Sequence, residues 1–399
     1  MSLESLFKEI KEHPAFQRLN GISQLGVKHL IYPNFKNRTR MDHSERVADI
    51  SKQITQVLEE KGCLKDESEI NAINVAALLH DIGHPPFSHT GERIWGIKHK
   101  EKGIEIMERW KDKNGNTIDD ILRKYKIDPE LVKHIIKKED EKGLWNIVGG
   151  KFGADKLEYV LVDSKNFADA GFNVAQISRK DIEEMINALY YDTKNKTLCF
   201  ESGVEDRIER YQKAYVSLYY DGIFLDVPVA LERIFEKHLQ NSGIANNCDL
   251  FEMSQEEILE KLNLNIEKEN LEEAKTICRM CYEEVKDKFG SVDMISLCNS
   301  LEEKFKENYG IEVIVAFVSY RGPELPKIRD ENGNITEMYG NEYKELIKKA
   351  NENSGIRVIV LKEREDYGIA IKKGELKKII YSLTEMPGKG KCLVASYFA

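Results

Sequence analysis

Apolar residues recur at helical spacing through most of the first three hundred positions. Near the N-terminus, Phe16, Leu19 and Ile22 follow this period and predict one buried helical face. From about residue 311 the period changes, and Ile311–Val318 and Arg357–Leu361 have the continuous apolar character of β-strands. The pattern predicts a mainly α fold whose last ninety or so residues form a small α+β lobe.

The same pattern divides the chain into three expected parts. We expect a helical core over residues 1–245, a helical extension over 246–310 and the α+β lobe over 311–399. The extension includes a Glu- and Lys-rich helical pattern over Gln255–Val285, and a turn is expected at Asp330–Asn334, before a helix over Tyr343–Ala350.

The most informative predicted helix, Ile70–Asp81, ends in an adjacent histidine and aspartate, His80 and Asp81. Gly83 and two prolines then break the helix. Neutral imidazole and carboxylate together suit a divalent transition metal, or Mg²⁺ or Mn²⁺ with more oxygen ligands. Two residues do not complete a site, so a further histidine and aspartate are needed from other helices. The best-placed candidates are His43 and Asp155.

Residues around these candidates suit phosphoryl chemistry. A protein-bound metal lowers the pKa of its bound water and so yields a nucleophile. Phosphoryl transfer also needs cations for the phosphate oxygens and a proton donor for the leaving oxygen. Arg40, Lys156 and Arg207 are candidate cations, and His84, His89 and His99 are candidate acids. The residues alone predict a metal-dependent hydrolase and leave its substrate open.

Two further stripes admit both a functional and a structural interpretation. Asp155, Tyr159 and Asp163 recur every four residues and share one helix face, which fits either a binding face or a solvated one. Arg207 and Tyr215 lie on a similar stripe, where tyrosine more often packs than binds a ligand.

Composition narrows the function classes. A net charge of -9 over 399 residues disfavours a general grip on nucleic acid through a basic surface. There is no apolar run of membrane-spanning length and no signal peptide pattern, so we expect a cytoplasmic protein with no membrane partner. Seven scattered cysteines indicate reduced thiols, and Cys278 and Cys281 are interpreted as helix-face cysteines rather than a zinc site.

The set His43, His80, Asp81 and Asp155 resembles the signature of the HD superfamily of metal-dependent phosphohydrolases. The surrounding blocks are similar to the deoxynucleoside triphosphate triphosphohydrolases of that superfamily, which include dGTPases. The matching blocks are Phe16–Leu19, Gln24–Gly26, Arg40–Ser44, Leu79–His89, Asp155–Asp163 and Arg207–Tyr215. The resemblance is strong to about residue 220 and weaker beyond it.

This resemblance implies a role for each candidate. His43, His80, Asp81 and Asp155 would hold a divalent metal, one of Mn, Mg, Fe, Zn, Ni or Co. Arg40, Lys156 and Arg207 would hold the triphosphate, and His84, His89 and His99 would line its phosphate side, with His89 or His99 as the acid. Tyr159, Asp163 and Gln24 would contact the sugar 3′ hydroxyl, and Tyr215 would pack against the sugar. The implied reaction is attack of metal-bound hydroxide on the α-phosphorus, which releases deoxynucleoside and inorganic triphosphate.

The resemblance also implies a homo-oligomer, as a dimer or tetramer. Departures from the family pattern are Ser217, where relatives have histidine, and Glu12 and Asn20 at the positions of a nucleotide-activator site. These departures argue against activation by guanine nucleotides. Two alternatives stay open: an HD phosphohydrolase acting on another nucleotide or phosphate ester, and a non-catalytic nucleotide-binding regulator on the same scaffold.

Overall fold

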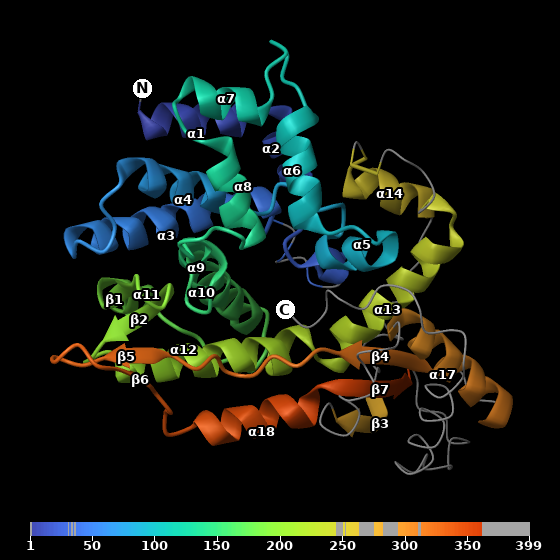
Figure 1. The fold of residues 1–399 in the computed structure, drawn as a ribbon. Coiled ribbons are helices and arrows are strands. Elements are labelled where there is room, and N and C mark those ends of the chain that lie inside the picture. Colours follow the sequence, from blue (N-terminus) through green and yellow to red (C-terminus); the bar gives the residue numbers. More distant parts are fainter. Residues whose placement is uncertain are drawn as a thin grey trace. The chain divides into compact units, whose positions relative to one another are not determined.

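The computed structural model forms two compact units, each built from separate stretches of the chain (Figure 1). The first contains Met1–Tyr215, Leu239–Leu264 and Glu324–Asn341, and the second contains Val216–His238, Asn265–Pro323 and Glu342–Ala399. The expected boundaries at residues 245 and 310 therefore do not separate the units. The structure describes residues 2–30, 32, 35, 37–244, 250, 251, 253–262, 275–281, 294–309 and 313–360.

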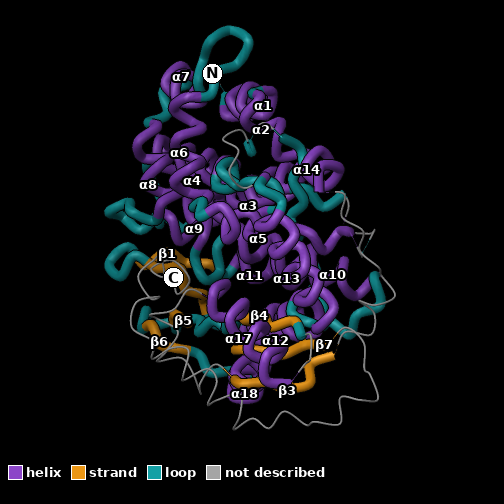
Figure 2. Tube along the Cα trace, turned by 90° about the vertical axis from the view of Figure 1, so that its right-hand side faces the viewer, coloured by secondary structure: helices purple, strands orange, loops and turns teal. Residues whose placement is uncertain are grey.

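Helix α3 (Arg40–Glu60) lies at the centre of the first unit and packs against α4 (Glu67–Leu79) and α10 (Ala154–Asp169) (Figure 2). Thr39 begins α3 by accepting a hydrogen bond from the backbone N–H of Asp42 at 3.1 Å. The apolar residues Val47, Ile54 and Leu58 of α3 are fully buried, whereas α4 is buried on every side from Ala72 to Leu79. The helical core predicted from periodicity is confirmed.

The first unit contains further helices besides these three. They are α1 (Leu3–Glu12), α2 (Pro14–Gln17), η1 (Arg18–Gly21), η2 (Gly26–Leu30), α5 (Ser88–Trp95), α6 (His99–Arg109), α7 (Ile118–Lys124), α8 (Pro129–Lys137), α9 (Trp145–Gly149), α11 (Arg179–Asn187), α12 (Glu205–Leu218) and α14 (Gln255–Leu262). None of the helices in the described ranges is long and apolar enough to cross a membrane.

A four-stranded sheet in the first unit joins distant parts of the sequence. Its order is β1-β2-β5-β6, with β2 and β5 parallel and the other pairs antiparallel. The strands are β1 (Leu189–Asp192), β2 (Thr197–Glu201), β5 (Lys327–Arg329) and β6 (Ile335–Glu337). The predicted turn at Asp330–Asn334 is confirmed, since Asp330 Oδ1 accepts hydrogen bonds from the N–H groups of Asn332 and Asn334. The expected C-terminal lobe thus contributes two strands to the helical unit.

The second unit contains an antiparallel sheet of order β3-β7-β4. Strands β4 (Ile314–Val318) and β7 (Gly355–Val360) and helix α18 (Tyr343–Asn353) confirm the period change seen in the sequence. The helix expected across Gln255–Val285 is wrong at β3 (Lys275–Cys281), which pairs with β7. Cys278 and Cys281 therefore lie on a strand and not on a helix face. The other elements are η4 (Tyr219–Ile223), α13 (Asp226–Asn241) and α17 (Met294–Tyr309), and the predicted strand residue Leu361 and the rest of the lobe to residue 399 lie outside the described residues.

Candidate active site

The four predicted metal ligands converge at one point in the first unit. His43 lies in the first turns of α3, His80 and Asp81 follow α4 directly, and Asp155 lies in the first turn of α10. The His43 Nε2 atom is 3.2 Å from Asp155 Oδ1 and 3.6 Å from Asp81 Oδ2. The His80 Nε2 atom is 3.3 Å from Asp81 Oδ1 and 3.9 Å from Asp155 Oδ1. The structure brings together residues that three separate helices supply.

The Nδ1 atom of each of the two imidazoles makes the contact that orients its ring. His43 Nδ1 is 2.5 Å from Glu158 Oε2, and His80 Nδ1 is 2.8 Å from the carbonyl oxygen of Ala77. Within the described residues, the Nε2 atoms of both rings are buried and have no hydrogen-bond partner. Buried polar atoms are rarely left in this state unless a ligand uses them. Two such nitrogens beside two carboxylates fit a divalent transition metal.

Charges at this centre favour ionised carboxylates. Burial raises the pKa of Asp81, but the charges of Arg40 and the neighbouring histidines hold that pKa well below its usual range. Burial likewise raises the pKa of Asp155, yet His43 and His80 lower it overall. Burial lowers the pKa of His43, but the charges of Glu158 and Asp81 and the contacts of the ring with Glu158 and Asp155 together outweigh it, and the pKa rises to about 9. Both carboxylates are therefore available as ligands.

Glu158 and Arg38 support the centre from behind and were not singled out in the sequence. The Arg38 guanidinium donates hydrogen bonds to both carboxylate oxygens of Glu158, at 3.0 and 2.7 Å, and its Nε donates to Asp163 Oδ1 at 2.8 Å. Both Arg38 and Glu158 are almost completely buried. Asp163, expected at the sugar, is thus engaged in a buried ion pair. The available signal for Glu158 was its place one helical turn after Asp155.

The backbone between His80 and His84 is fixed by contacts from other elements. Helix α4 ends at Leu79, two residues earlier than predicted. Arg18 donates hydrogen bonds to the carbonyl oxygens of Ile82 at 2.8 Å and His84 at 2.6 Å. Gly83 packs so closely on α6 that an added Cβ would lie 1.9 Å from the His99 carbonyl oxygen. Gly83 therefore acts through close packing as well as by breaking the helix.

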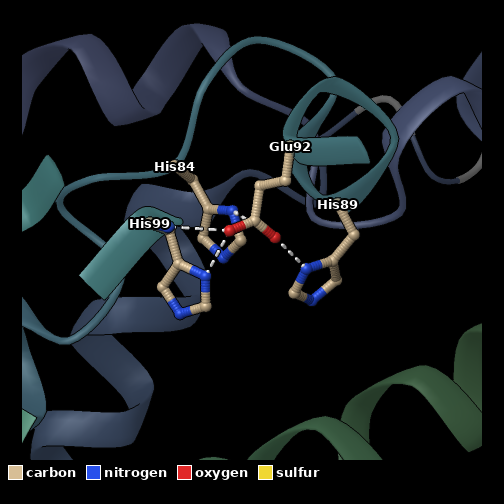
Figure 3. A group of neighbouring side chains, drawn as sticks. All are labelled: His84, His89, Glu92 and His99. Atoms are coloured by element: carbon tan, nitrogen blue, oxygen red, sulfur yellow. Dashed lines mark hydrogen bonds and ion pairs between the residues drawn. The ribbon is translucent and has the colours of Figure 1, made fainter. Parts of the chain in front are cut away.

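The three histidines expected on the phosphate side gather around a carboxylate that the sequence did not single out, Glu92 on α5 (Figure 3). His89 Nδ1 is 2.5 Å from Glu92 Oε2, and His99 Nδ1 is 2.6 Å from Glu92 Oε1. The His99 backbone N–H also donates to Glu92 Oε1 at 2.8 Å. We call His84, His89, Glu92 and His99 the Glu92 cluster. The i, i+3 spacing of His89 and Glu92 was the available sequence signal.

The Glu92 cluster adjoins the metal ligands through His84. Its Nε2 atom is 3.3 Å from Asp81 Oδ1, and its ring stacks on His99 with centroids 4.1 Å apart. Burial, Arg40 and His99 lower the pKa of His84 well below its ordinary value, which favours the neutral ring. The His89 side chain is 63% exposed, so it can meet a ligand from solvent. A carboxylate that holds two imidazoles in this way orients them for proton transfer.

The predicted triphosphate cations have protein partners in this structure. Arg40 donates from Nη1 to Asp81 Oδ2 at 2.6 Å and from Nε to Ser88 Oγ at 2.9 Å. The Lys156 ammonium is 2.6 Å from Glu324 Oε1. Arg207 forms ion pairs with Glu184 and Asp206. Arg40 is thus tied to a metal ligand, whereas Arg207 is held by carboxylates of α11 and α12.

The predicted sugar contacts have different environments. The Gln24 Oε1 atom is buried and has no hydrogen-bond partner within the described residues, and its sugar contact stays a prediction. Tyr159 is half-buried one turn after Asp155. Tyr215 is 3% exposed and stacks on Tyr211, which is the packing role that its spacing favoured.

Known proteins are similar to this chain in sequence and in fold. The HD domain family model matches residues 40–182. An uncharacterized protein of Methanocaldococcus jannaschii is 28% identical over 337 residues, which cover 81% of this chain and 67% of that protein. A deoxynucleoside triphosphate triphosphohydrolase of Mus musculus is 31% identical over 146 residues, 34% of this chain and 21% of that enzyme. The chain spans about half the length of several other curated relatives.

A solved structure supports the same fold. The phosphohydrolase from Bacteroides thetaiotaomicron aligns with a TM-score of 0.65 at 20% identity, covering 89% of this chain and 95% of that one. The matched domain, 40–182, contains His43, His80, Asp81 and Asp155 together with the Glu92 cluster. Residues 40–182 therefore match an HD domain, and the candidate metal ligands lie inside it.

Proposed function

We propose that this protein is a metal-dependent deoxynucleoside triphosphate triphosphohydrolase that releases deoxynucleoside and inorganic triphosphate. One observation carries the proposal: oriented histidines of the Glu92 cluster lie directly beside the candidate metal ligands, with His84 Nε2 3.3 Å from Asp81 Oδ1. Water activation and leaving-group protonation need these two kinds of group at one site. The similarity to the mouse triphosphohydrolase over 146 residues supports the choice of substrate.

The residues divide the work as follows. A divalent metal held by His43, His80, Asp81 and Asp155 would activate water and neutralise phosphate charge. His89, which Glu92 holds by its Nδ1 atom, would present Nε2 to the leaving 5′ oxygen, and His99 is held in the same way. Neutral His84 would donate a hydrogen bond to a phosphate oxygen.

Substrate contacts form the less direct part of the proposal. Lys156 would exchange Glu324 for phosphate, and Arg207 would exchange Glu184 and Asp206. Gln24 and Tyr159 would contact the sugar. Asp163 and Tyr215, both almost completely buried, would pack behind the side chains that contact the sugar. A homo-oligomer remains a prediction that light scattering on the purified chain can test.

The test is product identity. Each of the four common dNTPs is incubated with the protein and Mn²⁺ or Mg²⁺, and ³¹P NMR separates inorganic triphosphate from phosphate. Triphosphate is the expected product. Asp81→Asn should form none, whereas Glu101→Gln, a substitution at an exposed position of α6, should form as much as the wild type. Phosphate release alone would replace this proposal by a phosphohydrolase of different substrate. Absence of turnover in a protein that binds metal would favour the non-catalytic regulator.

A further inference from the structure

A polar cavity of ≈ 470 Å³ lies beside the start of α3, and it contains none of the metal ligands or members of the Glu92 cluster. Its walls come from η1, η2 and Ser23 between them, from the first residues of α3 with Asn37 and Thr39 before it, and from the first turn of α14. The volume falls in the range of small-molecule sites, roughly 300–1,000 Å³. No role for this cavity follows from the proposed hydrolysis.

Two buried polar groups in its wall have no partner among the described residues. They are Ser23 Oγ and Gln255 Nε2, in side chains that are 5% and 4% exposed. The Gln255 amide is not free to turn, because its Oε1 accepts a hydrogen bond from the Ser23 backbone N–H at 2.7 Å. A buried donor without a partner costs about 1–3 kcal/mol. Two of them at one cavity indicate a ligand that supplies hydrogen-bond acceptors.

The charge of the lining selects against anions. Asp42, Glu45 and Glu256 line the cavity, and the described residues of its lining include no lysine or arginine. Among the described residues, Arg38 and Arg46 pair with Asp42, and Lys11 pairs with Glu45 at 3.0 Å, so Glu256 is the least balanced of the three acids. A phosphate group here would face carboxylates, whereas an amine or guanidinium would be attracted.

The cavity wall is linked to the candidate metal centre by a short chain of hydrogen bonds. Ser88 Oγ donates to the Ser23 carbonyl oxygen at 2.7 Å, and Arg40 Nε donates to Ser88 Oγ at 2.9 Å. Arg40 Nη1 then donates to Asp81 Oδ2 at 2.6 Å. Movement of Ser23 on ligand binding would therefore change how Arg40 holds a metal ligand.

We propose that this cavity is a regulatory site for a small organic cation that also carries a carbonyl or hydroxyl acceptor, coupled to the metal centre through Ser23, Ser88 and Arg40. The amine would lie toward Glu256, and the acceptor would meet Gln255 Nε2 and Ser23 Oγ. The inference goes beyond the proposed hydrolysis and does not depend on it.

Calorimetry on the full chain tests binding. The probes are argininamide, lysinamide and glucosamine, each with an amine or guanidine and an acceptor, and the comparators are spermidine, which lacks the acceptor, and GTP. At least one probe should bind more tightly than both comparators. Ser23→Ala keeps the backbone contacts of Ser23 and should weaken that probe about tenfold, the loss of one buried hydrogen bond. Glu256→Gln should weaken it as well, and Glu260→Gln, on the same helix but outside the lining, should not.

Coupling is measured separately from catalysis. A saturating probe should change the affinity for Mn²⁺ by about fivefold or more, and Ser88→Ala should abolish that change. Binding of the probe should persist in Asp81→Asn even if no dNTP is hydrolysed, so the two proposals fail independently. Failure of all three probes to bind, or equally tight binding of GTP, overturns the site. Probe binding with unchanged Mn²⁺ affinity overturns its regulatory role.

Discussion

Replacing Glu158 by glutamine tests whether the residues behind the metal ligands set metal affinity. Glu158 Oε2 faces both His43 Nδ1 at 2.5 Å and Arg38 Nη2 at 2.7 Å, and Oε1 faces Arg38 Nη1 at 3.0 Å. The amide keeps the shape of the side chain but removes its charge and turns one acceptor into a donor. In one orientation the new N–H group faces Nη1 of Arg38, and in the other it faces both His43 and Arg38.

The expected size of the effect follows from these contacts. Loss of one charge-assisted hydrogen bond in a buried pair costs about 1.5–3 kcal/mol of unfolding free energy. Arg38 keeps Asp163 at 2.8 Å and Asp42 at 3.2 Å, so the pair is weakened rather than left without a counter-charge. In the wild type, the Glu158 carboxylate orients the His43 ring and makes Nε2 a stronger metal ligand. Loss of such a partner typically lowers metal affinity about 10–100-fold.

Metal affinity is measured by calorimetric titration with Mn²⁺, and stability by urea unfolding of the metal-free protein. Asp163→Asn is the matched control, because it also weakens an ion pair of Arg38 but leaves the contact between Glu158 and His43 in place. We expect Glu158→Gln to lower both quantities and Asp163→Asn to lower stability alone. Unchanged Mn²⁺ affinity in Glu158→Gln, at any stability, would refute the reasoning that this carboxylate orients a metal ligand.

Three further predictions concern the surroundings of the site and the fold. Gly83→Ala should lower the unfolding free energy by about 3 kcal/mol or more and weaken Mn²⁺ binding, because the added Cβ would lie 1.9 Å from the His99 carbonyl oxygen. Gly21→Ala is the control, because a Cβ added there meets none of the described neighbours within 4 Å. Equal urea midpoints for the two variants would contradict the packing argument. Lys133→Met should lower the unfolding free energy in urea by about 3–5 kcal/mol, since the Lys133 ammonium lies 2.6 Å from buried Asp119 and within 3 Å of Glu108 and Glu130. A decrease below about 1 kcal/mol would be inconsistent with a buried ion pair. Burial raises the pKa of Asp192, but hydrogen bonds from Asn195 and Lys194 lower it overall, so its stabilisation is present above pH 4 and is lost as pH falls through the lowered pKa. Asp192→Asn should therefore be less stable than wild type by about 1 kcal/mol at pH 7 and equally stable near pH 2, as pH-dependent unfolding would show; a constant difference would disprove the linkage.

The sequence alone determined the features that depend on local pattern. The sequence predicted the helix before His80 and Asp81 and the helix that carries Asp155, Tyr159 and Asp163, which are α4 and α10 in the structure. The change of period predicted β4 and β7, and the Asp-Gly-Asn chemistry predicted the turn before β6. His80 and Asp81 could be named as metal-ligand candidates from their place at a broken helix end, and the resemblance to the HD superfamily supported His43 and Asp155 as their partners.

Tertiary structure decided everything that depends on which groups meet. The parallel pairing of β2 with β5 joins segments more than a hundred residues apart, and no local pattern encodes that partner. Lys275–Cys281 has a helix-compatible sequence but forms strand β3, which pairs with β7, since sheet pairing overrides a weak local preference. Glu92 and Glu158 are ordinary surface residues by sequence. Only packing buries them against imidazole rings, where a carboxylate without a positive or hydrogen-bonding partner would be too costly to keep.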